Sequence, residues 1–133
     1  MPRAQLLLYP VADRSLESGS MRQFTDTPLC NSVAGRRFNG LYFPFESREH
    51  VEYFSLVEAP SLAGQPPTYI EVTELDCLRD GWLLYEKRLR EQGVETELHE
   101  IGGAMHGYDI AAESSLVQWL METRAAFLQR TLE

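Results

Sequence analysis

The second half of the chain alternates strand-like and helix-like patterns, which limits the folds that it can adopt. Segment 68–73 is rich in the β-branched and aromatic residues of strands. A helix-like segment follows, in which apolar residues lie 4, 3 and 4 positions apart, at Leu78, Trp82, Tyr85 and Leu89. Segment 94–101 alternates like a strand with one wetter face, and a last helix is expected at about 114–132. This order predicts right-handed crossovers and a parallel sheet.

The remaining segments extend this α/β pattern. Residues 5–9 form a short apolar run, as in a strand that is covered on both faces. Residues 11–66 are irregular and loop-like or cap-like, with one short helix expected at about 31–43. We therefore expect a single domain over 1–133, with about three parallel strands (5–9, 68–73 and 94–101) and about four flanking helices.

Two of the expected helices have a predicted apolar side. In the short helix that side consists of Val33, the stem of Arg37, Phe38, Leu41 and Tyr42. In the last helix it consists of Leu116, Leu120, Thr123 and Phe127. Ser114 or Ser115 can cap the last helix, and the tryptophans at 82 and 119 are expected to pack in the core.

Charge and hydropathy exclude two classes of partner. Twelve Lys and Arg against twenty Asp and Glu give a net charge of −8, and the positive charges are scattered. Without a basic stripe to neutralise phosphates, we expect no nucleic-acid binding. No apolar run approaches the ~20 residues that cross a bilayer. The apolar stretch near the start of the chain is too short for a signal peptide. A cytoplasmic protein without a membrane span is the expectation.

The two cysteines do not form a recognisable metal motif. Cys30 and Cys77 lack metal-ligand spacing, so no metal or cofactor site is expected. Free thiols in a reducing compartment are the default, although the two residues could also pair.

One acid and one histidine follow successive predicted strands. Asp76 comes after the strand that ends near Thr73, and His106 after the strand that ends near Ile101. Reactive groups in parallel sheets gather beyond the carboxyl ends of strands. There, a carboxylate can orient an imidazole that shuttles protons. The structural alternatives are an Asp that caps a helix and a surface His in a glycine-rich loop.

Several motifs resemble the hormone-sensitive-lipase group of α/β-hydrolases. The segment 66–81, with Pro-Pro, a strand and then Asp-Cys-Leu-Arg-Asp, is similar to the family's Asp-Pro-Leu-x-Asp segment. Gly-Ala-Met-His-Gly-Tyr at 103–108 resembles its His-Gly-Phe segment, and the helix end at 85–94 and Leu-Tyr-Pro-Val at 8–11 match in order. The resemblance implies a partial α/β-hydrolase fold, with the N-terminal half of the fold missing.

By this resemblance, Asp76 is the acid and His106 the base of a catalytic triad, and Asp80 braces the helix start. Cys77 stands where the family has proline, and a thiol nucleophile at this position is the least favoured alternative. None of the nine serines lies in a Gly-x-Ser-x-Gly elbow, and there is no His-Gly-Gly-Gly motif for an oxyanion hole. We therefore expect the chain to be inactive alone.

Two functions follow. The chain is either the C-terminal part of a carboxylic-ester hydrolase, completed by an N-terminal half on another chain and then acting on a small ester, or a non-catalytic interaction module. In both cases the apolar strand 5–9 is expected to be covered, most simply in a homodimer. The aromatic-rich stretch 38–54 is expected to line a substrate cleft or to pack in a core or interface.

Overall fold

Three parallel strands form the sheet, in the order β1-β2-β3. The computed structural model describes residues 2–42 and 50–132. The strands are β1 (Gln5–Leu8), β2 (Thr68–Thr73) and β3 (Thr96–Ile101), close to the predicted bounds. All six residues of the central strand β2 are buried, whereas β3 has the wetter face expected of an edge. Since Thr73 is in register with Ile101, the loops that follow β2 and β3 leave the same edge of the sheet.

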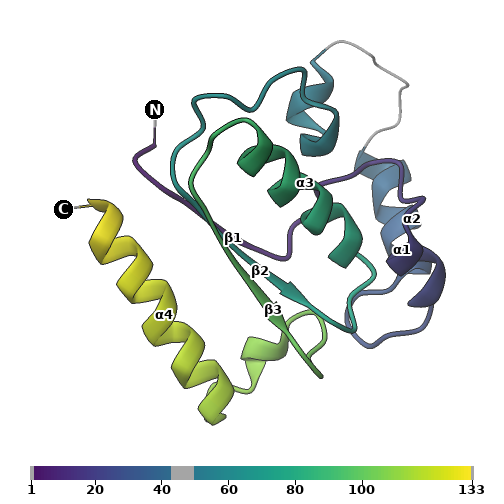
Figure 1. Ribbon diagram of the computed structural model, residues 1–133. Helices are drawn as coiled ribbons and strands as arrows, with labels where there is room; N and C mark the ends of the chain where they lie inside the picture. Colours follow the sequence, from purple (N-terminus) through teal and green to yellow (C-terminus); the bar gives the residue numbers. More distant parts are fainter. Residues whose placement is uncertain (1, 43–49, 133) are drawn as a thin grey trace.

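Four helices surround the sheet: α1 (Gly19–Gln23), α2 (Ser32–Tyr42), α3 (Arg79–Glu91) and α4 (Ser115–Leu132). Short 3-10 turns lie at Val51–Tyr53, Leu56–Glu58 and Tyr108–Ile110. In Figure 1, α3 lies on one side of the sheet and α4 on the other. No helix among the described residues is long and apolar enough to cross a membrane.

The two faces of β2 contact different helices because side chains alternate along a strand. Ile70 and Val72 pack in the core with α3, whose predicted apolar face (Leu78, Trp82, Tyr85 and Leu89) is buried. Tyr69 points the other way, and its ring centroid lies 5.4 Å from that of Phe127 of α4.

A short helix-to-strand connection follows α3. Gly93 in this connection adopts φ +77°, a conformation that glycine reaches without strain.

The predicted apolar face of α4 is wrong in part. Its buried residues are Val117, Leu120, Arg124 and Phe127, while Leu116 and Trp119 are exposed. A hydrophobic pattern does not mark Arg124 as a core residue. The predicted apolar face therefore includes Thr123, whereas the buried face includes its neighbour Arg124. The helix does begin next to the predicted cap, since the Ser114 hydroxyl accepts a hydrogen bond from the Val117 N–H at 3.2 Å.

The predicted apolar side of α2 is also largely exposed. Val33, Phe38, Leu41 and Tyr42 each expose about two thirds of their surface or more. The helix itself lies where expected, although Phe43, its predicted last residue, falls outside the described residues, as do positions 43–49 of the aromatic-rich stretch.

Candidate active site

Asp76 and His106 meet above the carboxyl ends of β2 and β3. His106 Nδ1 and Asp76 Oδ2 lie 2.8 Å apart, which is hydrogen-bonding distance. The carboxylate is 2% exposed, whereas the imidazole remains 23% exposed. The structure therefore brings together the two residues that the sequence singled out, with the acid buried and the base accessible.

Local hydrogen bonds fix the Asp76 carboxylate. Its Oδ1 accepts the Leu78 N–H at 2.9 Å, the side-chain-to-backbone turn that aspartate favours. Its Oδ2 also accepts a long hydrogen bond from the Thr73 hydroxyl at 3.4 Å. Asp76 therefore does not cap α3, which begins three residues later at Arg79. The carboxylate is instead aimed at the histidine.

The loops that carry the two residues are bonded to each other. The Leu75 N–H donates to the Ala104 carbonyl at 2.9 Å, and the Glu74 carboxylate accepts the Gly103 N–H at 2.7 Å. Gly103 has φ +69°, a left-handed conformation that disfavours residues with a Cβ. The Tyr9 ring lies 4.6 Å from the imidazole, centroid to centroid, and completes the cradle.

A buried ion pair anchors the histidine loop from the α4 side. Arg124 binds the fully buried Glu71 with two hydrogen bonds, of 2.8 and 2.6 Å. The hydroxyls of Tyr69 and Tyr108 also donate to Glu71. Tyr108 is two residues from His106, so this network ties the loop to the central strand. Sequence reasoning missed the network, because nothing in the local pattern pairs a strand glutamate with a distant arginine.

Asp80 braces the segment that opens α3, as the resemblance implied. Its Oδ2 accepts the Ser20 N–H at 2.8 Å, and its own N–H donates to the Ser20 hydroxyl at 3.2 Å. The Ser20 hydroxyl in turn donates to the Cys77 carbonyl at 2.7 Å. Helix α1 is thereby attached to the residue next to Asp76.

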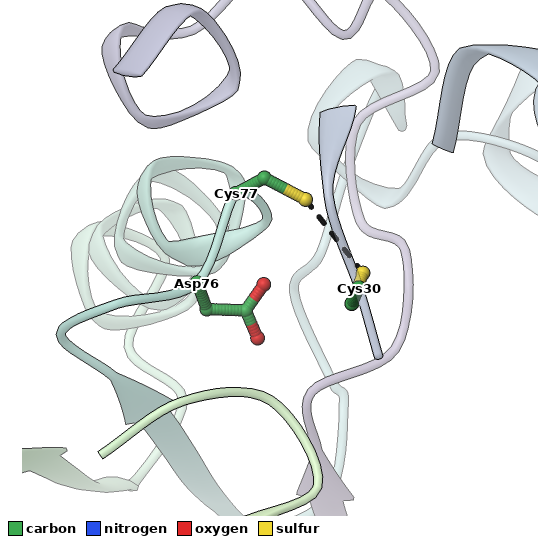
Figure 2. Close-up of side chains that lie close together, drawn as sticks. All are labelled: Cys30, Asp76 and Cys77. Carbon is green, nitrogen blue, oxygen red and sulfur yellow. Dashed lines mark hydrogen bonds between the residues drawn. The ribbon is translucent and has the colours of Figure 1, made fainter. Parts of the chain in front are cut away.

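The two cysteines lie beside the pair, although 47 positions separate them. Their sulfurs are 3.6 Å apart, with Cys77 fully buried and Cys30 half-buried. Figure 2 shows both thiols turned toward each other next to the Asp76 carboxylate. No motif spacing could have revealed this contact, because the fold of an irregular segment brings Cys30 there.

The hydrogen bond to Asp76, reinforced by Cys30, raises the pKa of His106 to about 10. Both neighbours thus stabilise the charged imidazolium form. The hydrogen bond from Cys77 lowers the pKa of the Cys30 thiol. The same bond, together with burial, raises the pKa of Cys77.

A cavity of about 780 Å³ opens onto the site. His106 and Cys30 are among its few polar lining residues, and most of the rest are apolar or aromatic: Tyr9, Leu29, Phe38, Leu41, Tyr42 and Tyr53. An apolar cavity with a few convergent polar groups is the usual form of a small-molecule site. The arrangement can hold an apolar group next to an imidazole that a carboxylate orients.

The chain is similar to proteins of one family along most of its length. A family model described as alpha/beta hydrolase fold matches residues 1–110. Lipase 2 of Moraxella sp. strain TA144 is 33% identical over 107 residues, which cover 80% of this chain and 25% of that protein. Carboxylesterase NlhH of Mycobacterium tuberculosis strain H37Rv is 31% identical over 107 residues, 78% of this chain and 34% of that protein.

Solved structures give the same result. A bacterial heroin esterase superimposes with a TM-score of 0.90 at 32% identity, over 98% of this chain and 43% of that one. A thermostable esterase from Pseudomonas putida ECU1011 superimposes with a TM-score of 0.92 at 29% identity, over 100% of this chain and 44% of that one. The chain thus spans about a quarter to a third of these curated relatives and less than half of these solved structures.

Proposed function

Because the chain belongs to the esterase- and lipase-like family of α/β-hydrolases, we propose that it is the part of a carboxylic-ester hydrolase that carries the triad acid and base. Asp76 is the acid, which holds the Nδ1–H of His106, and His106 transfers protons between a nucleophile and a leaving group. The observation that carries the proposal is the 2.8 Å contact between these two side chains, with His106 at the wall of an apolar cavity.

We further propose that the chain is inactive alone. Its 133 residues contain neither a Gly-x-Ser-x-Gly elbow nor a His-Gly-Gly-Gly motif. Without a nucleophile and preorganised oxyanion donors, the covalent step and most of the electrostatic stabilisation are missing. A second polypeptide that brings both would complete the site. The apolar lining of the cavity favours a small ester with an apolar acyl group as the substrate of the completed enzyme.

The test is hydrolysis of p-nitrophenyl butyrate by the chain alone and in a mixture. The second component is the N-terminal segment of a matching esterase, such as the Pseudomonas putida enzyme, with its elbow serine and oxyanion hole. We expect turnover only in the mixture, and His106→Ala should lower it by about 10²-fold or more. His50→Ala is the matched control, since the His50 side chain is 71% exposed and lies next to the Glu52 carboxylate and the Tyr53 ring.

Two results would contradict the proposal. One is turnover in the mixture that His106→Ala leaves unchanged. The other is no turnover in any mixture in which sedimentation shows that the two polypeptides associate, which would favour a non-catalytic interaction module instead.

The observation that favours the module is the free edge of β1. Among the described residues, β1 pairs only with β2, and its four residues are half-buried. An apolar strand edge pairs readily with another chain. A second copy of the chain, related by a two-fold axis, would cover it as a homodimer.

We also propose a cytoplasmic location and a single domain over residues 1–133. Support for the location comes from Cys30 and Cys77, which are free thiols, the usual state in a reducing compartment. Fractionation of the source cells tests the location. Finding the chain among the secreted proteins would contradict a cytoplasmic location.

A further inference from the structure

Three potential metal ligands converge next to the proposed acid. One sulfur each from Cys30 and Cys77 and one carboxylate oxygen of Asp76 all lie within 4.8 Å of one another. Asp76 and Cys77 are 2% and 0% exposed, so their side chains are held in place by the surrounding core. We infer that these three residues form a binding site for a thiophilic divalent metal ion, for which Zn²⁺ is the best match. The proposed ester chemistry neither needs nor implies this site.

The spacing of the sulfurs fits two ligands of one metal ion. Two thiolates bound to zinc at about 2.3 Å in tetrahedral geometry stand about 3.8 Å apart. Cys30 Sγ and Cys77 Sγ are 3.6 Å apart. A disulfide would need the sulfurs at about 2.05 Å, which requires a much larger movement. The present sulfur spacing is thus close to that of two ligands of one metal ion.

Asp76 can serve as the third ligand without losing its present partners. Each carboxylate oxygen has two acceptor sites. Oδ2 accepts from His106 and from the Thr73 hydroxyl, whereas Oδ1 accepts only the Leu78 N–H among these bonds and keeps one site for a metal ion. A hydrogen-bonded carboxylate is the usual outer-shell arrangement around a protein metal site. His106 would then act as a positioning residue, since it orients the carboxylate through the other oxygen.

The ligand set leaves one coordination position open. Three protein ligands plus water is a common zinc environment, and Cys30 lines the cavity through which water and the ion can enter. On binding, the S–H bonds of the thiols break, the protons pass to solvent, and two sulfur–metal bonds form. No atom is oxidised or reduced. Sulfur ligands favour zinc and similar ions over magnesium and calcium.

The experiment is a titration of the reduced chain with Co²⁺ under anaerobic conditions, followed by Zn²⁺. We expect one Co²⁺ per chain, with a sulfur-to-cobalt charge-transfer band in the near ultraviolet and the visible bands of tetrahedral cobalt. Zn²⁺ should displace the cobalt and abolish these bands. Cys30→Ser and Cys77→Ser should each remove most of the charge-transfer band, and His106→Gln should weaken binding by about tenfold, through the outer shell.

His50→Gln is the matched control, because it removes an exposed histidine next to a carboxylate and leaves the cysteine cluster intact. It should bind Co²⁺ like the unchanged chain. Because Cys77 is fully buried and its serine variant could unfold, a second measurement uses the unchanged chain. Bound Zn²⁺ should protect the Cys30 thiol, which lines the cavity, from iodoacetamide by at least tenfold in rate. Absence of the charge-transfer band, a band that survives Cys30→Ser, or a Cys30 thiol that Zn²⁺ fails to protect would each overturn the inference.

Discussion

At the scale of single residues, the groups of the candidate site and the buried Glu71 are held by partners from other elements of the fold. Asp76 and His106 could be predicted, because each directly follows a strand and parallel strands bring their ends to one edge. Cys30 could not, because it reaches the site from an irregular segment whose path no periodicity describes. The partnership of Glu71 with Arg124 was also unpredictable, since it depends on which faces of β2 and α4 meet.

Glu71 makes the stability of the protein sensitive to acid. Burial would raise the pKa of its carboxyl, but hydrogen bonds from Arg124, Tyr108 and Tyr69 outweigh burial, and the pKa lies below its ordinary value. The pKa of Glu71 in the folded protein therefore lies below its pKa in the unfolded chain, which is about 4.3. The ionised Glu71 carboxylate thus contributes stability that is fully present above its unfolded pKa. This stability is lost as the pH falls through its folded pKa.

We therefore predict that Glu71→Gln lowers the free energy of unfolding at pH 7 by about 3–5 kcal/mol, because it removes the buried counter-charge of Arg124 and leaves only the longer ion pair with Asp109, at 3.5 Å. The difference between the two proteins should shrink as the pH falls below about 4. Urea unfolding between pH 7 and pH 3 measures both. Arg130→Met, which removes an exposed ion pair with Glu97, should cost at most about 1 kcal/mol. A difference in free energy of unfolding between Glu71→Gln and the unchanged chain that stays constant with pH would contradict the prediction.

At the scale of elements, hydrophobic periodicity predicted some buried faces correctly and others wrongly. Helix α3 buries the predicted face, and β2 has the predicted bounds. The same reasoning failed for α4, whose core-facing stripe contains a charged residue, and for α2, whose apolar side remains exposed. A pattern records which residues are apolar, but the partner surface decides which of them become buried.

The two tryptophans test this distinction. Trp82 of α3 is 1% exposed and its indole N–H donates to the Pro10 carbonyl, whereas Trp119 of α4 is 53% exposed. We expect Trp82→Ala to lower the free energy of unfolding by about 3–5 kcal/mol, through cavity formation. Trp119→Ala should change it by about 0.5 kcal/mol or less, as for most surface substitutions. Equal losses in urea unfolding would show that the assigned burial of the two helices is incorrect.

At the scale of the whole molecule, helices cover both faces of the sheet, and in the part of the chain that the structure describes no strand pairs with the outer edge of β1 (Figure 1). The fold class could be predicted from the order of elements alone, because strand–helix crossovers allow few arrangements. The partner that covers the β1 edge could not be predicted, because the sequence describes only one side of any interface.

We predict that the chain is a dimer at micromolar concentration when no complementing polypeptide is present. The half-buried β1 edge offers unpaired backbone groups and apolar side chains that a second copy can cover. Sedimentation velocity across a dilution series measures the association. Adding the N-terminal esterase segment should convert the dimer to a heterodimer if both partners use this edge. A monomer at all concentrations tested would contradict the prediction.

The ion pair between β2 and α4 also limits how far the protein can be shortened. The match to the family ends at residue 110, yet the counter-charge of the buried Glu71 comes from Arg124, beyond that limit. A shortened version that followed the family boundary would leave the Glu71 carboxylate buried without its counter-charge, and the Tyr108 hydroxyl would lose the Arg124 side of its hydrogen bonds. Deletion studies should therefore keep the chain through at least Phe127, whose ring contacts Tyr69 of the central strand.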